Sequence, residues 1–415
     1  MAQPDRCAEP ARSLTLDDAL ARILAAMPPA ADRVDLPLRQ ALGRILAADI
    51  HAPFDLPPFA NSAMDGYALR HADVAGQPDA ALAVVGTAFA GRPYTGTVET
   101  GQCVRIFTGA AMPAGADSVL MQEDAIPEDG HIRLSRLPAT AANVRPPGDE
   151  IRAGGRLLER GRRLNAADLG LLASAGLAEV AVTRQLRVAF FSTGDELRPL
   201  GEALGPGQIH DSNSHMLHGL LTDPAIAAID LGAVRDDPAA LRQILLDASG
   251  QADAIVTTGG VSVGDADFVT PALAELGRVE FWKVAVKPGK PFAFGKIGPA
   301  WLFGLPGNPV AVMVTFLQLV RPALLQLMGA TARRPLRLKA TSRSVLKKSP
   351  GRMEFQRGVF APDGAGGLIV EGVAGQGSHQ LIGMSRANCF IVLPTDTAGV
   401  KPGDVVDIEP FIEGY

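Results

Sequence analysis

The chain has 415 residues, a net charge of −5, and hydrophobic and charged fractions of 47% and 20%. This composition is that of a soluble globular protein, and the length predicts about two to four domains rather than one core. The longest apolar stretch, residues 310–320, is shorter than the ~20 residues that span a bilayer. Three widely spaced cysteines without a Cys-x-x-Cys pair, and an N-terminus without an apolar signal segment, lead us to expect a cytoplasmic protein.

The N-terminal part of the chain changes from a helical to a β-type pattern. Residues 1–12 are expected to form a disordered tail. Thr15 predicts a helix N-cap, because an amphipathic pattern follows it, and a second helix is predicted over 38–48. From 52 to 148, short β-type runs are separated by Gly, Pro and Asp, which predicts a β-rich domain.

Helical periodicity returns after the β-rich segment. Asn165 predicts another N-cap, with Asp168 in the first turn of the helix that follows. The two helical pieces, 13–51 and 149–184, could pack together. We therefore predict that the β-rich domain is inserted into a discontinuous linker domain of helical and mixed structure.

Residues 185–334 predict an α/β domain. Strand-like and helix-like runs alternate there, which is typical of a doubly wound, mostly parallel sheet. The predicted strands are 188–192, 226–231, 254–258 and 301–305. After Pro335 the strand pattern returns with Gly and Pro turns, which predicts a barrel-like C-terminal β-domain over 335–415.

Three loops punctuated by glycine or proline follow one another in the α/β domain. They are residues 257–267, 287–292 and 304–310, and two of them join a strand to a helix. Loops at the carboxyl ends of parallel strands offer backbone N–H groups beside helix N-termini, which suits an anionic ligand. The sequence has no Walker lysine pattern and no Gly-x-Gly-x-x-Gly, so neither a P-loop NTPase nor a Rossmann dehydrogenase is supported.

Acidic residues are expected to gather at the same sheet edge. Glu196 follows the first predicted strand, Asp236 precedes a helix N-cap at Asp237, and Asp267 lies at the start of the helix after residues 257–267. Because loops at the carboxyl edge of one sheet converge, these three carboxylates could share a magnesium-type oxygen site. Each acid taken alone is interpreted as a surface residue, whereas the set favours a metal site.

Basic residues follow in the second half of the domain. Residues 282–287 alternate with period two, so Lys283 and Lys287 are predicted to project from one strand face, with Lys290 in the next turn. This ladder suits an anion, and a solvated edge strand gives the same pattern. The basic run 333–357 lacks aromatic interleaving, so it predicts a solvated strand face rather than a nucleic-acid patch.

Two polar turns lie outside the α/β domain. One carries Asp65 between a methionine and a glycine, and the other carries Thr108 after a strand-like run. Either turn alone is interpreted as ordinary turn chemistry.

Together these segments resemble the MoeA family of molybdopterin molybdenumtransferases, which is also represented by the C-terminal domain of gephyrin. The resemblance runs from about residue 16 to residue 410. The motifs that carry it are 61–68, 107–110, 192–197, 235–237, 257–267, 281–292, 304–310, 351–358 and 376–379. Any one motif is weak, but their order and spacing are specific.

The resemblance implies a fold and a reaction. It implies four domains in an elongated homodimer, with a cleft between the α/β domain of one subunit and the β-rich domain of the other. It implies a magnesium-dependent transferase that hydrolyses adenylylated molybdopterin, releases AMP and inserts molybdate into the dithiolene. The implied protein partners are the molybdopterin adenylyltransferase and molybdoenzyme apoproteins.

The resemblance also implies roles for individual residues. The implied catalytic residues are Asp65, Thr108, Glu196, Asp236, Asp267, Lys283 and Lys287. The implied magnesium ligands are Glu196, Asp236 and Asp267. The implied substrate-binding residues are Thr193, Gly194, Ser212, Asn213, Gly259, Gly260, Ser262, Gly264, Lys290, Pro306, Pro309, Arg357 and Ser378. Asp65 and Thr108 are implied to act in the cleft of the other subunit.

Two other functions stay open at this level. A related molybdopterin adenylyltransferase or nucleotide-processing enzyme could share the α/β domain, but it would not need flanking β-domains with Asp65 and Arg357. A non-catalytic scaffold that binds the cofactor is the other alternative. The presence of the three acids and both lysines argues against pure scaffolding.

Overall fold

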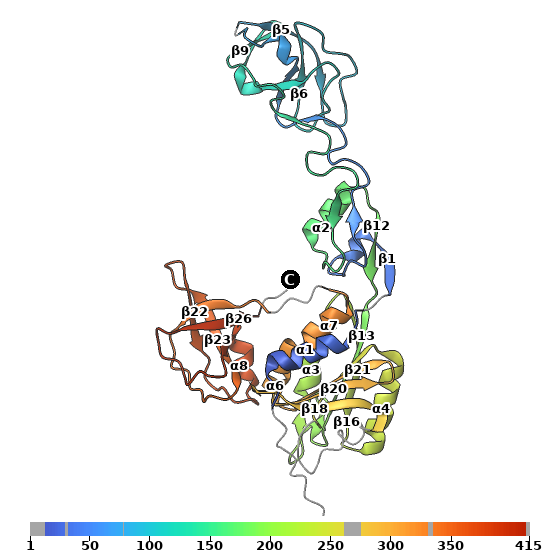
Figure 1. The fold of residues 1–415 in the computed structure, drawn as a ribbon, viewed down its shortest axis with the longest axis vertical. Coiled ribbons are helices and arrows are strands. Elements are labelled where there is room, and N and C mark those ends of the chain that lie inside the picture. Colours follow the sequence, from blue (N-terminus) through green and yellow to red (C-terminus); the bar gives the residue numbers. More distant parts are fainter. Residues whose placement is uncertain (1–12, 30–31, 78, 261–274, 331–334, 412–415) are drawn as a thin grey trace, which may run out of the picture.

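The molecule is elongated (Figure 1). The computed structural model describes residues 13–29, 32–77, 79–260, 275–330 and 335–411. The α/β domain and the C-terminal β-domain lie side by side at one end, and the β-rich domain lies at the other. Between them lies the linker segment with β1 (Arg33–Pro37), β12 (Glu179–Thr183) and α2 (Ala166–Ser174).

A six-stranded sheet forms the centre of the α/β domain. Its strand order is β16 (Ile226–Val234), β13 (Leu186–Thr193), β17 (Ala254–Thr258), β21 (Ala300–Leu305), β20 (Pro291–Ile297) and β18 (Gly277–Lys283). The first four strands are parallel, whereas β20 is antiparallel to both of its neighbours. This arrangement confirms the predicted doubly wound, mostly parallel fold.

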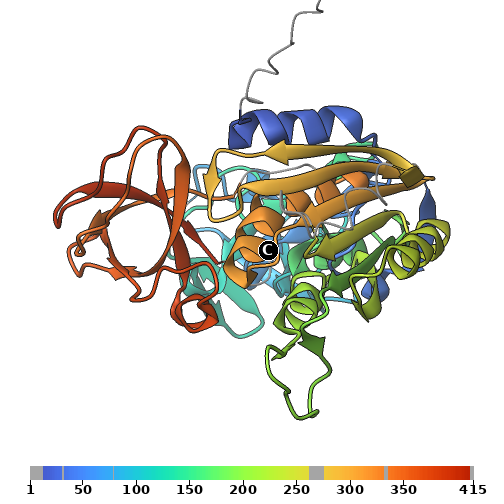
Figure 2. The same cartoon turned by 90° about the horizontal axis from the view of Figure 1, so that it is seen from below.

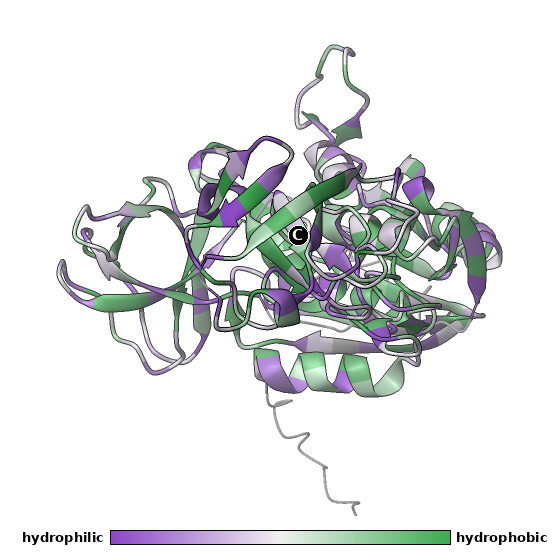
Figure 3. Cartoon of the chain, turned by 90° about the horizontal axis from the view of Figure 1, so that it is seen from above, coloured by the Kyte–Doolittle hydropathy of each residue, from purple (hydrophilic) through white to green (hydrophobic). Residues whose placement is uncertain are grey.

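Helices cover both faces of this sheet because side chains alternate along each strand. Phe190 of β13 packs in the core shared with α1 (Leu16–Ala26), whereas the next residue, Phe191, packs in the core beneath α4 (Pro238–Gln251). Helix α1 carries both hydrophobic and hydrophilic residues (Figure 3), and its buried residues Leu16, Ala19 and Ile23 share one helical face. The Thr15 Oγ1 accepts a hydrogen bond from the Asp18 N–H at 3.1 Å, so the predicted N-cap is confirmed.

One helix of the described chain is apolar enough to cross a membrane by length and composition. It runs from Pro309 to Leu327 as α6 (Pro309–Thr315), a π-helical turn (Phe316–Val320) and α7 (Arg321–Leu327). Its apolar window is 72% buried inside the protein, so it packs as the central core helix of the α/β domain.

The linker segment is more β-like than its sequence predicts. Helix α2 has the predicted cap, because the Asn165 side chain accepts from the Asp168 N–H and the Asp168 carboxylate accepts from the Asn165 N–H, both at 3.0 Å. The helix predicted over 38–48 is wrong, because only a 3₁₀ turn forms, over Leu38–Ala41. Gly43 then adopts a φ of +74°, which stops a helix, and the chain continues in β-bridges.

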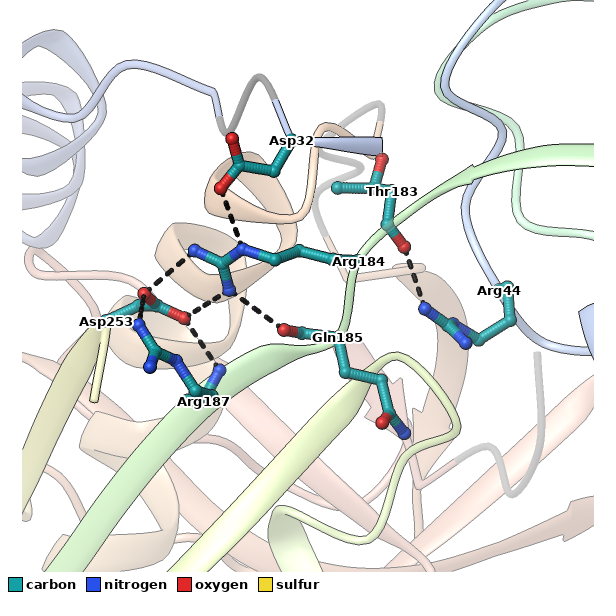
Figure 4. A network of polar contacts seen from close by, with 7 residues as sticks. All are labelled: Asp32, Arg44, Thr183, Arg184, Gln185, Arg187 and Asp253. Carbon is teal, nitrogen blue, oxygen red and sulfur yellow. Dashed lines mark hydrogen bonds and ion pairs between the residues drawn. The ribbon is translucent and has the colours of Figure 1, made fainter. Parts of the chain in front are cut away.

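A charged network joins the linker segment to the α/β domain (Figure 4). Arg184 lies between β12 and β13, where the chain passes from one to the other. Its guanidinium donates to Asp253 at 2.7 and 2.9 Å and to Asp32 at 2.8 Å, and Arg187 donates to Asp253 at 3.0 Å. The two chain crossings between these parts are therefore held by one arginine.

Two further sheets form the flanking β-structure. The β-rich domain has the strand order β7 (Ser118–Met121), β4 (Gly66–Leu69), β6 (Gln102–Ile106), β5 (Ala81–Ala88), β9 (His131–Leu134) and β8 (Ala125–Glu128). The C-terminal domain has the order β23 (Met353–Pro362), β24 (Leu368–Gly372), β22 (Leu338–Ser342), β26 (Val405–Pro410) and β25 (Cys389–Leu393). Because β23 also pairs with β25, this second sheet closes into the predicted barrel, visible in Figure 2.

Candidate active site

A pocket of about 1100 Å³ opens between the carboxyl edge of the α/β sheet and the barrel. The loops after β13, β16, β17 and β21 contribute to it from the α/β domain. The barrel contributes β23 and the turn that precedes α8 (Leu381–Arg386). This is the edge at which open α/β sheets bind ligands. The sequence-predicted residues that line it are Thr193, Gly194, Glu196, Ser212, Asn213, Asp236, Gly259, Gly260, Lys287, Lys290, Pro306, Pro309 and Ser378.

Glycines are required where the pocket wall comes closest to the backbone. Gly259 has a φ of +87°, and a Cβ there would lie 2.5 Å from the Thr193 carbonyl oxygen. Gly260 follows with a φ of +64°. Only glycine adopts this geometry without strain, so the chain turns sharply after β17 and leaves the backbone accessible to a ligand. Ser262 and Gly264, which were predicted in the same loop, lie outside the described residues.

Acidic side chains line the pocket at one end of the strand order. Glu196 follows β13, and Asp236 follows β16, which is the edge strand. The third predicted acid, Asp267, lies outside the described residues. Within the described part of the chain, no group of three His, Cys, Asp or Glu residues could hold a metal ion. The magnesium site therefore stays a prediction that needs Asp267.

Asp211 is a further acid in the pocket wall, and its role is structural. It is 7% exposed, and its carboxylate accepts from the N–H groups of Asn213 and Ser214 at 3.0 and 3.1 Å. It thereby caps α3 (Ser212–Leu220). The cap places Ser212 and Asn213 at the pocket, where the Asn213 side chain donates to the Gly307 carbonyl at 2.8 Å.

Basic side chains line the opposite end of the pocket, but not as the predicted ladder. Residues 282–287 do not form one strand, because β18 ends at Lys283 and β19 (Val286–Lys287) pairs with β23 of the barrel. Lys287 and Lys290 line the pocket, whereas Lys283 does not. The predicted common face for Lys283 and Lys287 is therefore wrong, since the two lysines belong to different sheets.

The barrel side of the pocket contains residues that the sequence interpretation missed. Arg352, Glu354 and Gln356 line the pocket from β23 and its start. Their alternate spacing was a usable signal, but it lies in the basic run that predicted a solvated face. Glu354 is 6% exposed and accepts from the Lys287 Nζ at 3.0 Å. This ion pair joins the barrel to the α/β domain inside the pocket.

Arg357 lies behind the pocket wall rather than in it. Its side chain is 1% exposed and donates to the Gly377 and Gly375 carbonyls at 3.1 and 2.7 Å. Burial lowers the pKa of this guanidinium. Arg357 thus supports the turn that carries Ser378, and the Ser378 carbonyl accepts from the Val310 N–H in the first turn of α6.

Asp65 and Thr108 come together in the β-rich domain. The Asp65 carboxylate accepts from the Thr108 N–H at 2.8 Å and from the Thr108 Oγ1 at 2.7 Å. These two hydrogen bonds lower the pKa of Asp65. Neither residue lines the pocket of its own chain, because the β-rich domain lies at the far end of the molecule (Figure 1).

Comparison with known proteins matches three consecutive segments of the chain to known family regions. Residues 14–176 match the MoeA N-terminal region (domain I and II), residues 189–326 a probable molybdopterin binding domain, and residues 339–411 the MoeA C-terminal region (domain IV). The chain is 44% identical over 400 residues to a molybdopterin molybdenumtransferase of Haemophilus influenzae, which covers 96% of this chain and 98% of that protein. It is 39% identical over 377 residues to the Nostoc protein of the same name, and the alignment covers 88% of this chain and 85% of that protein.

A solved structure extends the match to three dimensions. The molybdopterin biosynthesis MoeA protein of Pyrococcus horikoshii OT3 superimposes with a TM-score of 0.85 at 29% identity, which covers 96% of this chain and 100% of that chain. The three family regions occur in order, and relatives align along nearly the full length. The chain therefore belongs to the MoeA family of molybdopterin molybdenumtransferases.

Proposed function

We propose that this protein hydrolyses adenylylated molybdopterin, releases AMP and inserts molybdate into the dithiolene in the cytoplasm. The observation that carries the proposal is one pocket with opposite charges at its two ends. Glu196 and Asp236 come from the β13 and β16 end of the sheet, whereas Lys287 comes from β19 and Lys290 from the loop before β20 at the other end. Such a pocket can hold a metal-bound phosphate and an oxyanion at the same time.

The basic end of the pocket suits the oxyanion. Lys287, Lys290 and Arg352 present ammonium and guanidinium donors from two short segments that meet where β19 pairs with β23. Charge-assisted hydrogen bonds from such groups orient a tetrahedral anion. Residues 376–379, whose turn Arg357 supports from behind, line the same pocket and would bound the substrate there.

The acidic end suits a magnesium ion. Carboxylate oxygens are the ligands that magnesium prefers, and Glu196 and Asp236 lie in the pocket wall, with Asp267 proposed as the third ligand from the loop after β17. When bound, magnesium would neutralise the charge of the substrate pyrophosphate. The protein residues then have to hold the phosphate, and the backbone of the glycine turn at Gly259 and Gly260 lines the pocket where it could do so.

We further propose that the site is completed by a second copy of the chain in a homodimer. The Asp65–Thr108 pair is a preorganised carboxylate and hydroxyl in a domain far from the pocket of its own chain. In a two-fold dimer of elongated subunits, this pair would reach the pocket of the other subunit. The family assignment and this separation support the proposal.

The test is AMP release from adenylylated molybdopterin by the purified full-length protein, with and without molybdate and magnesium. The proposal predicts AMP release that rises with molybdate and forms molybdenum cofactor, and that falls when magnesium is removed. AMP release independent of molybdate would indicate a plain hydrolase. No AMP release, with ligand binding retained, would indicate a scaffold.

A further inference from the structure

Glu354 is a buried carboxylate inside the basic end of the pocket. It is directly opposite Lys287 in the parallel pairing of β19 with β23, so both side chains lie on one face. The Lys287 Nζ donates to the Glu354 Oε1 at 3.0 Å, and the Gln356 Nε2 donates to the same oxygen at 3.1 Å. Gln356 is itself fixed, because its amide also donates to the Lys347 carbonyl at 2.9 Å.

The exposures of the two partners differ strongly. The Glu354 side chain is 9% exposed, whereas the Lys287 side chain is 50% exposed. The carboxylate is therefore the fixed partner, and the ammonium retains donor capacity toward the pocket. A fixed carboxylate restricts the directions in which the long Lys287 side chain can point.

Glu354 also limits the positive charge of this end of the pocket. Lys290 and Arg352 line the pocket in the two segments that meet at Lys287 and Glu354, and neither forms an ion pair within the described residues. Three cations and one carboxylate leave a local charge of +2. This value matches a doubly charged tetrahedral anion and leaves a more highly charged anion, such as pyrophosphate, incompletely neutralised.

We propose that Glu354 is a specificity-determining residue of this pocket, which positions Lys287 and sets the local charge for a dianion such as molybdate. The proposal rests on the proposed function, since that function places the oxyanion at the basic end. Positioning and charge make separate contributions. Loss of positioning weakens the binding of all anions alike, whereas loss of the negative charge favours anions in proportion to their charge.

The experiment compares the binding of molybdate and of inorganic pyrophosphate to the full-length protein by calorimetry at fixed ionic strength. Glu354→Gln removes the charge, and Glu354→Asp keeps it but shortens the side chain so that the contact with Lys287 is lost. Asp407→Asn is the matched control, because Asp407 pairs with the exposed Lys339 at 2.8 Å in the same barrel, outside the pocket. Circular dichroism checks that each variant is folded.

The expected result is a change in the ratio of the two dissociation constants. In Glu354→Gln, the ratio should shift by about tenfold in favour of pyrophosphate, as expected for one unit charge near the ligand. In Glu354→Asp, both affinities should fall by about threefold with the ratio unchanged. Asp407→Asn should match the wild type.

Three outcomes would overturn the proposal. They are an unchanged ratio in Glu354→Gln, the same shift in Asp407→Asn, and no binding of either anion by the wild type. Because binding is measured without turnover, a protein that shows the ratio shift but releases no AMP would retain this inference while the proposed function fails.

Discussion

Arg184 binds Asp253 through both of its terminal nitrogens, with Nη1–Oδ2 and Nη2–Oδ1 distances of 2.7 and 2.9 Å. The Nε of the same guanidinium binds Asp32 at 2.8 Å (Figure 4). Asp32 precedes β1 and Arg184 follows β12, so the contact holds both chain crossings at the start of β13. Arg163 of the linker segment also pairs with Asp223 of the α/β domain at 2.9 Å, so the Arg184 network is one of the contacts that hold the two parts together.

Replacement of Arg184 is expected to destabilise the protein. Arg184→Gln leaves the partly buried Asp253 with fewer donors, which should cost about 2–4 kcal/mol of unfolding free energy. Urea unfolding followed by circular dichroism measures this loss. The control is Arg133→Gln, whose pair with Glu128 is 50% exposed on both sides and should contribute less than about 1 kcal/mol. Equal losses in the two variants would contradict the predicted contribution of Arg184 to stability.

The same network predicts a stability change at low pH. Desolvation alone would raise the pKa of Asp253, but hydrogen bonds from Arg184 and Arg187 outweigh it and lower the pKa to about 2. A lowered pKa means that the stabilisation is complete above about pH 4 and is lost as the pH falls toward 2. Unfolding midpoints measured between these pH values should fall in the wild type. They should fall less in Arg184→Gln. Equal decreases in the two proteins would show that the Arg184–Asp253 contact does not cause the acid sensitivity.

Gly259 is predicted to tolerate no side chain. Gly259→Ala combines a φ of +87° with a contact of 2.5 Å to the Thr193 carbonyl oxygen, so it should destabilise the protein by about 3 kcal/mol or move the pocket wall. Gly207→Ala separates the two effects, since Gly207 has a φ of +76° and nothing within 4 Å of its Cβ position. It should lose only about 1 kcal/mol. Thermal unfolding and ligand affinity of both variants test this. Equal losses in the two variants would show that the contact with the Thr193 carbonyl oxygen does not matter.

Arg357 is predicted to affect substrate binding indirectly, because it supports the turn that carries Ser378. Arg357→Lys keeps the charge but loses the two-pronged contact with the Gly375 and Gly377 carbonyls, so substrate affinity should fall by about tenfold. Because the residue is 1% exposed, Arg357→Met should also lose about 2–4 kcal/mol of stability. Steady-state kinetics with thermal unfolding measures both effects. A loss of kcat alone, with KM unchanged, would indicate direct contact with the reacting groups instead.

The mostly parallel sheet was predictable because its strands are continuous apolar runs between helix caps. Phe190 and Phe191 are buried on opposite faces of the sheet, and strands covered on both faces are hydrophobic over much of their length. The caps at Thr15 and Asn165 were predictable for a similar reason, because a cap depends on local chemistry alone.

The errors arose where tertiary contacts override the local pattern. Residues 38–48 have helical spacing, but Gly43 turns the chain into β-bridges. Residues 282–287 alternate like one strand, yet the chain leaves one sheet and enters another between Lys283 and Lys287. Glu354 was missed because its alternate spacing lies in a basic run that favoured a solvated face, and because its partner Lys287 lies 67 residues away in the sequence.

The most direct test of the account is complementation between two inactive subunits. Asp65→Ala and Asp236→Ala homodimers should each release little AMP, because each change affects every pocket. Mixed subunits should regain about a quarter of wild-type activity, because half of the dimers are then hybrids with one intact pocket. This recovery should be measured as AMP release after mixing. Activity that stays at the level of the separate variants would show that Asp65 does not serve the pocket of the other subunit.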